Sequence, residues 1–181
     1  ELWTAFAVID AVGAKKGPPQ KASRIHHGDL SSKLGSGLLA TWADGTQVAY
    51  NATFSANDGF HGRSWSLTLR PDCCLWSPET GLHVLDAKFK VLGTLAGEGE
   101  ASATVKKDDL HKMHAYRDAI SGARSAWVMY PGTTNAVWTP PGASGPLEGV
   151  GAVPVVPGVP HEELRVLVGR MLERPAASDA V

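Results

Sequence analysis

The segment LHVLDAKFKV, residues 82–91, constrains the fold more than any other part of the sequence. Its pattern predicts a β-strand, and successive side chains of a strand point to opposite faces of the sheet. One face of this strand carries only apolar side chains, namely Leu85, Ala87 and Phe89. That face has to point into a core, so we expect the charged pair Asp86 and Lys88 on the opposite face of the sheet.

A second strand is predicted just upstream, over residues 64–76, and residues 78–81 predict the turn between the two. If the strands pair as a hairpin, Asp72 lies beside Asp86, because paired strands run about 4.8 Å apart. Two carboxylates at that separation repel each other unless a cation lies between them. Mg²⁺ suits such a place, since it is bound by one or two carboxylates and keeps several waters.

These two strands therefore carry the residue types of a phosphodiesterase centre. Waters kept by a divalent ion can be activated as nucleophiles. A lysine beside the ion, here Lys88, can orient the attacking water and stabilise the charge that grows on a phosphate. The alternative is a plain ion pair on the surface of a β-hairpin, which the spacing alone favours because Asp-x-Lys triplets are frequent by chance.

The remaining patterns predict a mixed sheet with helices packed on it. Asp44-Gly45, between two alternating runs, predicts a hairpin. Pro154 predicts that its strand lies at an edge, since proline cannot donate to a central ladder. We expect helices over residues 1–14, 108–120 and 164–172, strands over 38–42, 47–54, 126–130 and 150–156, and a mobile loop over 92–104.

Length and charge fit one globular domain. The chain has 181 residues, about the size of a single domain, and no apolar run long enough for a transmembrane helix. Its formal net charge of −1 excludes a histone-like polycation, but a nucleic-acid enzyme needs only a local basic stripe. The two cysteines, Cys73 and Cys74, are neighbours that cannot bridge without strain, which predicts a reducing, cytoplasmic setting. The start at Glu1 without a Met predicts a piece of a longer protein.

The run Arg-Pro-Asp at 70–72, thirteen further residues, and then Asp-Ala-Lys at 86–88 resemble the PD-(D/E)XK nuclease superfamily. These are metal-dependent nucleases of the restriction-endonuclease-like fold. Several other pieces look like the McrBC-like restriction nucleases: ELW at 1–3, YNATF at 50–54, KKDDLHKMHAYRDAI at 106–120 and VMYPG at 128–132. The resemblance spans residues 1–156 in ordered pieces and implies an α/β fold, a mixed sheet flanked by helices.

The resemblance also implies roles for particular residues. Asp72 and Asp86 would hold a Mg²⁺ or Mn²⁺ ion together with the carbonyl of Ala87. Lys88 would be the catalytic lysine, and Glu1 would be the acid of the first helix that supports the metal site.

Related nucleases often carry a Gln-x-x-x-Tyr pair on the following helix, and the matching residues here are Lys112 and Tyr116. A lysine in that place can contact a phosphate. At 100° per residue, Asp109 falls inside the apolar arc of this helix and Lys112 at its edge. The two charges either serve the site or pair with each other and only fix the helix.

We therefore expect residues 1–175 to form a PD-(D/E)XK nuclease domain and residues 176–181 to form a disordered tail. The expected activity is metal-dependent hydrolysis of DNA in a restriction or phage-defence system. Expected partners are DNA, other domains of the parent protein and an AAA+ NTPase subunit, with no membrane. The alternative is an inactive module of the same fold that binds nucleic acid or a partner, and RNA stays open as a substrate.

Overall fold

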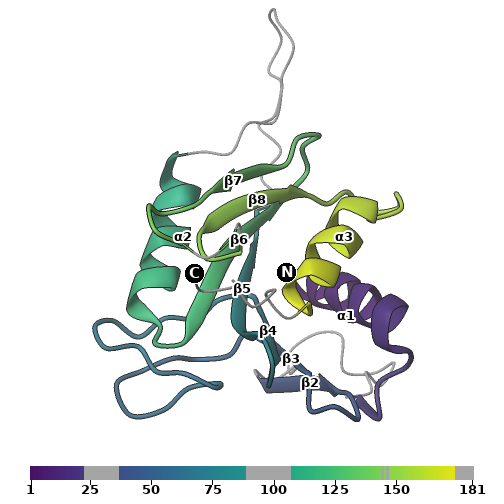
Figure 1. Cartoon of the computed structure of the whole chain (residues 1–181), viewed down its shortest axis with the longest axis horizontal. Coiled ribbons are helices and arrows are strands. Elements are labelled where there is room, and N and C mark those ends of the chain that lie inside the picture. Colours follow the sequence, from purple (N-terminus) through teal and green to yellow (C-terminus); the bar gives the residue numbers. More distant parts are fainter. Residues whose placement is uncertain (23–36, 89–106, 144, 146, 174–181) are drawn as a thin grey trace, which may run out of the picture.

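A mixed sheet of eight strands runs through the middle of the molecule (Figure 1). The computed structural model describes residues 1–22, 37–88, 107–143, 145 and 147–173. The strands lie in the order β1-β2-β3-β4-β5-β6-β8-β7. Their bounds are β1 Lys21–Ala22, β2 Gly37–Thr41, β3 Gln47–Tyr50, β4 Cys73–Ser77, β5 Gly81–Ala87, β6 Ala123–Tyr130, β7 Ala136–Trp138 and β8 Val150–Pro154.

Half of the sheet is antiparallel and half is mainly parallel. Strands β1 to β5 pair antiparallel with their neighbours in chain order. Strands β5, β6 and β8 are parallel, and β7 runs antiparallel on the outer side of β8. A parallel pair needs a long crossover connection, and α2 (Lys107–Ala119) lies within the one that joins β5 to β6.

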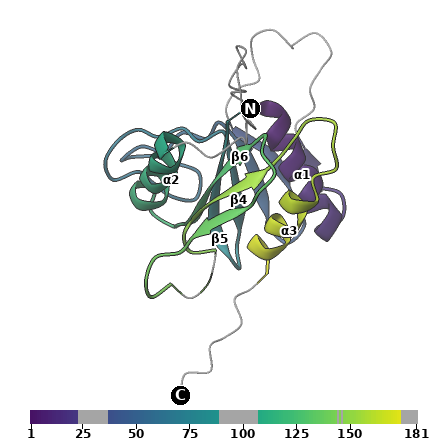
Figure 2. The same ribbon diagram turned by 90° about the horizontal axis from the view of Figure 1, so that it is seen from above.

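The helices of the described residues cover both faces of the sheet, as Figure 2 shows. Helix α2 lies on one face, and α1 (Leu2–Lys16) and α3 (Glu162–Met171) lie on the other. Alternation along β5 sends Val84 into the core under α2 and Leu85 into the core under α1 and α3. The structure thus confirms the predicted α/β class. The side of β5 that carries Asp86 is covered as well, by α2, and Asp86 is fully buried there.

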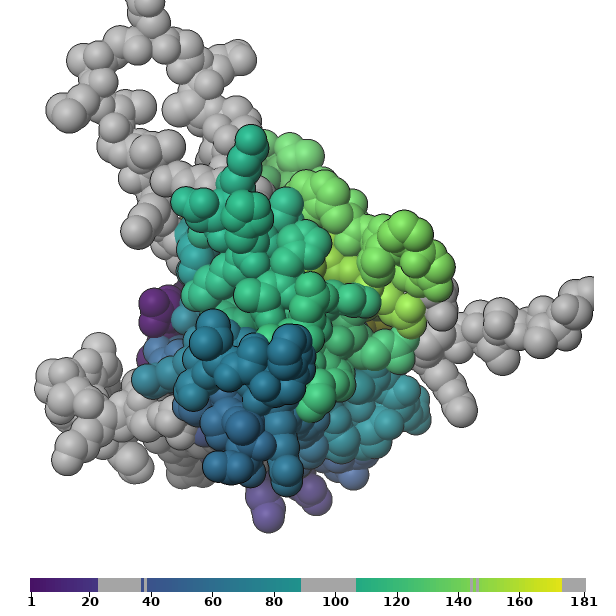
Figure 3. Space-filling view, turned by 90° about the vertical axis from the view of Figure 1, so that its left-hand side faces the viewer, coloured from purple at the N-terminus to yellow at the C-terminus, as the bar shows by residue number. Residues whose placement is uncertain are grey.

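The strand predicted over residues 64–76 is wrong over residues 64–72. Only Cys73–Ser77 form a strand. The residues before it form a long loop with two isolated β-bridges. Leu69 pairs with Phe54 near the start of the loop, and Ser64 pairs with Ile120, just after α2. The alternating side chains of this loop point into solvent: Trp65 is 74% exposed and Leu67 is 71% exposed. Figure 3 shows the loop in blue beside α2 in green.

The prediction of an edge strand over residues 150–156 is also wrong, because β7 lies outside β8. Strand β7 covers only Val150–Ala152 of β8, so Pro154 lies beyond it. The N–H of Val155 donates to the Tyr130 carbonyl of β6. Since N–H groups alternate in direction along a strand, the nitrogen of Pro154 points away from β6, to the side of β8 where the pairing with β7 has already ended.

Other differences are small. Helix α1 continues through Gly13 to Lys16, and its most deeply buried apolar side chains are small ones, such as Ala5 and Val8, whereas Trp3 is exposed. The mobile loop predicted over 92–104 and the tail predicted over 176–181 lie outside the described residues. Within the described part of the chain, no helix combines the length and apolar character that crossing a bilayer requires.

Candidate active site

The hairpin of β4 and β5 brings the two predicted carboxylates together. A three-residue turn joins the strands, and Gly81 takes the positive φ of 86° at its end. The register places Cys73 opposite Leu85, so the residue before Cys73, Asp72, falls opposite Asp86. Both side chains then point to the face that α2 covers, as the even-numbered neighbours Cys74 and Val84 do.

Asp72 lies just before the first residue of β4, and its side chain accepts a backbone hydrogen bond that a strand residue would otherwise accept. Its Oδ2 accepts a hydrogen bond of 2.8 Å from the backbone N–H of Ala87, which has passed the end of β4. Burial and then the charge of Asp86 raise the pKa of Asp72, while the Ala87 N–H works in the other direction. The carboxylate is therefore held in place by backbone, close to a second negative charge.

Asp86 is completely buried, and its hydrogen-bond partners among the described residues are two ammonium groups and a phenol hydroxyl. A buried carboxylate is costly unless it is paired and hydrogen-bonded. The donors are the Nζ atom of Lys88, the Nζ atom of Lys112 at 3.0 Å from Oδ1 and 3.2 Å from Oδ2, and the hydroxyl of Tyr116 at 3.2 Å from Oδ1. The reading of Asp86 and Lys88 as a plain surface pair therefore does not hold.

Helix α2 supplies two of these donors because Lys112 and Tyr116 are four residues apart and share one flank of the helix. The Lys112 ammonium reaches across to Asp86 and not to Asp109 of its own helix. The alternative in which Lys112 only pairs with Asp109 is thus not what the structure shows.

Lys88 follows the last residue of β5, where the strand leaves the sheet. Its backbone N–H donates to Met129 of β6, and its Nζ contacts Asp86 and lies 3.4 Å from the Ala87 carbonyl. Burial favours the neutral amine, but the hydrogen bond and the charge of Asp86 outweigh it and raise the pKa of Lys88. Lys88 therefore remains a cation.

Tyr116 is buried, and its hydroxyl lies between two acceptors, Asp86 and the backbone carbonyl of Arg70 at 3.3 Å. Burial and then the negative charge of Asp86 raise the pKa of Tyr116 well above its usual range. The phenol therefore keeps its proton and acts as a donor. The Arg70 carbonyl was not expected from the sequence, because a backbone acceptor leaves no trace in residue type.

Glu1 lies at the start of α1 and is exposed. Its charge contributes to the raised pKa of Asp72, after burial and Asp86, and to that of Tyr50, after burial. Glu1 is thus near the carboxylate pair. It does not join it in a ligand cluster, because no group of three or more His, Cys, Asp or Glu that could hold a metal occurs among the described residues. Tyr50 was not singled out from the sequence.

The donor set fits a hard divalent cation. Asp72 and Asp86 offer carboxylate oxygens side by side, and Ala87, the residue after Asp86, has a backbone carbonyl that lies 3.4 Å from the Nζ of Lys88. Oxygen ligands, with waters filling the other positions, suit Mg²⁺ or Mn²⁺ and not a zinc site built from cysteine and histidine.

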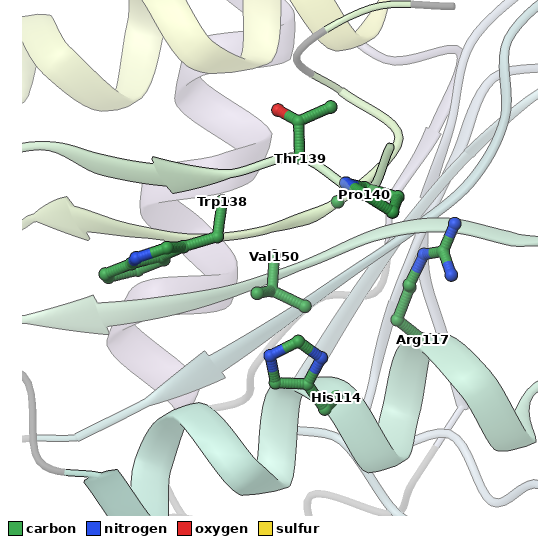
Figure 4. Close-up of a pocket in the computed structure, with 7 residues that line it drawn as sticks. His114, Arg117, Trp138, Thr139, Pro140 and Val150 are labelled. Atoms are coloured by element: carbon green, nitrogen blue, oxygen red, sulfur yellow. The ribbon is translucent and has the colours of Figure 1, made fainter. Parts of the chain in front are cut away.

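A small surface pocket lies on the other flank of α2 (Figure 4). It has a volume of about 130 Å³ and is lined by His114, Arg117, Trp138, Thr139, Pro140, Gly149 and Val150. The Arg117 guanidinium already binds the Asp118 carboxylate and the Glu148 carbonyl. At 100° per residue, this flank points away from the one that carries Lys112 and Tyr116. The pocket is therefore separate from the carboxylate pair.

The sheet, its flanking helices and the Asp72–Asp86–Lys88 group together define the restriction-endonuclease-like class of fold. The family model of the PD-(D/E)XK nuclease superfamily matches residues 1–135, about three quarters of the chain, and the chain belongs to this superfamily. The match includes all seven candidate site residues and ends before β7. Searches of curated proteins and of solved structures each give no significant match.

Proposed function

We propose that this chain is a metal-dependent endonuclease domain that hydrolyses phosphodiester bonds of DNA. One observation carries the proposal: Asp72 and Asp86 lie opposite each other on a hairpin, with Lys88 at the end of the same strand. A structural ion pair needs one acid and one base. A second buried acid next to the first adds repulsion, which a cation bound by both acids would relieve.

A Mg²⁺ or Mn²⁺ ion would be held by Asp72, Asp86 and the carbonyl of Ala87, where it supplies an activated water and neutralises charge on the scissile phosphate. Ala87 contributes two backbone groups to this place: its N–H fixes the Asp72 carboxylate, and its carbonyl oxygen is the proposed third ligand. In this proposal Glu1 binds the ion only through water, since it stands outside the direct ligand group.

Lys88 is the residue proposed to act on the phosphate. Its raised pKa keeps it charged, and a quarter of its side chain is exposed, so its ammonium is open to a substrate. A fixed cation at this place orients the attacking water and stabilises the pentacovalent phosphate. Tyr116 is a positioning residue in this scheme, because its phenol holds Asp86 without carrying charge.

A restriction or phage-defence role is part of the same proposal. It is supported by the McrBC-like sequence pieces, two of which form α2 and the end of β6 in this structure. In such a system the domain acts beside DNA-reading domains of the parent protein and an AAA+ NTPase subunit, in the cytoplasm.

Two matched measurements test the activity. Wild-type protein is incubated with plasmid DNA and either Mg²⁺, Mn²⁺ or EDTA, and Mn²⁺ binding is measured by calorimetry. We expect cleavage with a divalent ion only, and loss of both cleavage and Mn²⁺ binding in Asp86→Asn. Glu79→Gln, an exposed change in the β4–β5 turn, is the control that keeps both.

Three outcomes overturn the proposal in different ways. Equal Mn²⁺ affinity of wild type and Asp86→Asn removes the metal assignment. Nucleic-acid binding without cleavage under every ion identifies an inactive binding module of the same fold. Cleavage of RNA and not of DNA corrects the substrate.

A further inference from the structure

The Lys112 ammonium binds the carboxylate of Asp86, which is also a proposed ligand of the metal ion. Its Nζ lies 3.0 Å from one oxygen of Asp86 and 3.2 Å from the other, so it bridges both. Lys88 binds the same carboxylate. In this arrangement the two lysine charges equal in number the charges of Asp72 and Asp86, and both ammonium groups contact Asp86.

A divalent ion and Lys112 cannot both keep this position. An ion bound to Asp86 would lie within a few ångströms of the ammonium, and two cations at that distance repel strongly in a partly buried place. The site must then release a lysine when it takes up the ion.

Lys112 is the lysine that can leave. Its side chain is 42% exposed, against 25% for Lys88, and it comes from the surface of α2. Lys88 is anchored by its backbone bond to Met129 and contacts the Ala87 carbonyl as well. Tyr116 can stay on Asp86 after the exchange, because its neutral hydroxyl does not repel a metal ion.

We propose that Lys112 is an internal substitute for the metal ion: it neutralises Asp86 in the free protein and is displaced toward a phosphate of the nucleic acid when the ion binds. This inference rests on the proposed function, because it takes Asp86 as a metal ligand. Its consequence is that ion and nucleic acid bind cooperatively, since the ion frees the ammonium that the nucleic acid uses. Such coupling is reciprocal and typically amounts to about 5- to 150-fold in affinity.

The first test measures Mn²⁺ binding to the free protein by calorimetry. Lys112→Gln removes the competing charge, so we expect Mn²⁺ to bind at least about fivefold more tightly than to wild type. Lys112→Arg keeps the charge and is expected to stay near wild type. Lys107→Gln, an exposed lysine at the start of α2, is the matched control and leaves the affinity unchanged.

The second test measures binding of a DNA duplex by fluorescence anisotropy at several salt concentrations, with EDTA or with Ca²⁺ as a non-cleaving ion. In Ca²⁺, Lys112→Gln is expected to reduce the slope of log affinity against log salt by about 0.9, the value of one phosphate contact. In EDTA the slope is expected to equal that of wild type, because Lys112 then stays on Asp86.

An unchanged or weaker Mn²⁺ affinity of Lys112→Gln overturns the inference, and so does an equal loss of slope in Ca²⁺ and EDTA. Far-UV circular dichroism establishes that the variants are folded, and Lys112→Arg gives the second comparison if Lys112→Gln is not. If the wild type binds Mn²⁺ through Asp86 but its Mn²⁺ affinity does not depend on Lys112, only this inference is wrong. If the wild type binds no Mn²⁺, the proposed function is wrong as well.

Discussion

Asp72 stands opposite Asp86 across the β4–β5 hairpin, and its carboxylate accepts the N–H of Ala87, the residue that follows Asp86. The backbone of one strand thus fixes the acid of the other. This hydrogen bond stabilises the charge of Asp72 in part, and the fold bears the repulsion that remains between the two carboxylates. Variants of this pair should therefore separate what the site does from what the fold needs.

Asp72→Asn is expected to stabilise the protein while it abolishes cleavage. The amide oxygen still accepts the Ala87 N–H, but the repulsion with Asp86 is gone. We expect the free energy of unfolding at pH 7 to rise by about 0.5–2 kcal/mol, the usual size of such gains at active sites. Urea unfolding followed by tryptophan fluorescence measures it.

The gain should also depend on pH. Burial and Asp86 raise the pKa of Asp72 in the folded state above 3.8, so just above pH 3.8 the folded state binds more protons than the unfolded one. Ionised Asp72 therefore costs stability above this range and costs none below pH 3.8. The difference between Asp72→Asn and wild type should vanish at about pH 3, and a difference that grows on acidification contradicts the assignment.

Lys88→Ala is expected to lower the cleavage rate by about 10²–10³-fold, as loss of one electrostatic donor does elsewhere. Asp86 keeps Lys112 and Tyr116 as partners, so we expect a loss of only about 1–2 kcal/mol in the free energy of unfolding. Single-turnover cleavage and thermal unfolding are measured on the same preparation, with Lys107→Ala as control. A variant that cuts at the wild-type rate removes Lys88 from the mechanism, and one that unfolds makes it structural.

His83 should make the protein sensitive to mild acid. It is buried on β5 beside Ser125 at 2.8 Å, and burial, helped by the charge of Arg124, lowers its pKa from 6.5 to about 4. Between these values the unfolded state binds the proton and the folded state does not, so stability falls as pH drops from about 6.5 to 4. The expected loss from this residue is up to about 3 kcal/mol.

Denaturant midpoints of wild type and His83→Gln between pH 4 and 7.5 measure this loss. The wild type should lose stability more steeply than the variant as the pH falls, whereas His114→Gln, an exposed histidine on α2, should follow the wild type. Parallel curves for wild type and His83→Gln would show that the pKa of His83 is the same in the folded and unfolded states and would contradict the prediction.

Gly151 and Gly169 should respond in opposite ways to alanine. A Cβ on Gly151 would lie 2.3 Å from the ring of Trp127, which is buried between β6 and the helices, whereas a Cβ on Gly169 of α3 would meet nothing within 4 Å. Gly151→Ala is expected to cost about 1–3 kcal/mol through overpacking, and Gly169→Ala to gain about 1 kcal/mol through helix propensity. Thermal unfolding of both variants decides, and equal effects contradict the packing described here.

The hairpin that carries the carboxylates could be predicted from the sequence because its signals are local. The alternation of residues 82–87 and the turn before Gly81 set both the strand and the register. Strand β7 escaped prediction because three residues, Ala136–Trp138, are too short for a periodic pattern. The exposed run around Trp65 alternates like a strand, but it forms only isolated bridges at Ser64 and Leu69 and therefore stays a loop.

The burial of Asp86 could not be predicted for a different reason. Its partners Lys112 and Tyr116 lie about 30 positions downstream, on a helix whose place over the sheet depends on the whole β5–α2–β6 crossover. Local pattern shows that Lys112 lies near the buried arc of its helix, but not which acid it meets. The pairing with Asp86 and not with Asp109 is a product of tertiary structure.

The short turn between β4 and β5 has a meaning for how this chain can change over time. Because side chains alternate with a period of two, one residue inserted into that turn would send Asp72 to the opposite side of the sheet from Asp86. Substitutions in the exposed positions of the turn leave the pairing intact. The length of the turn is therefore under the same constraint as the identity of the two carboxylates, whereas the exposed residues within it are not.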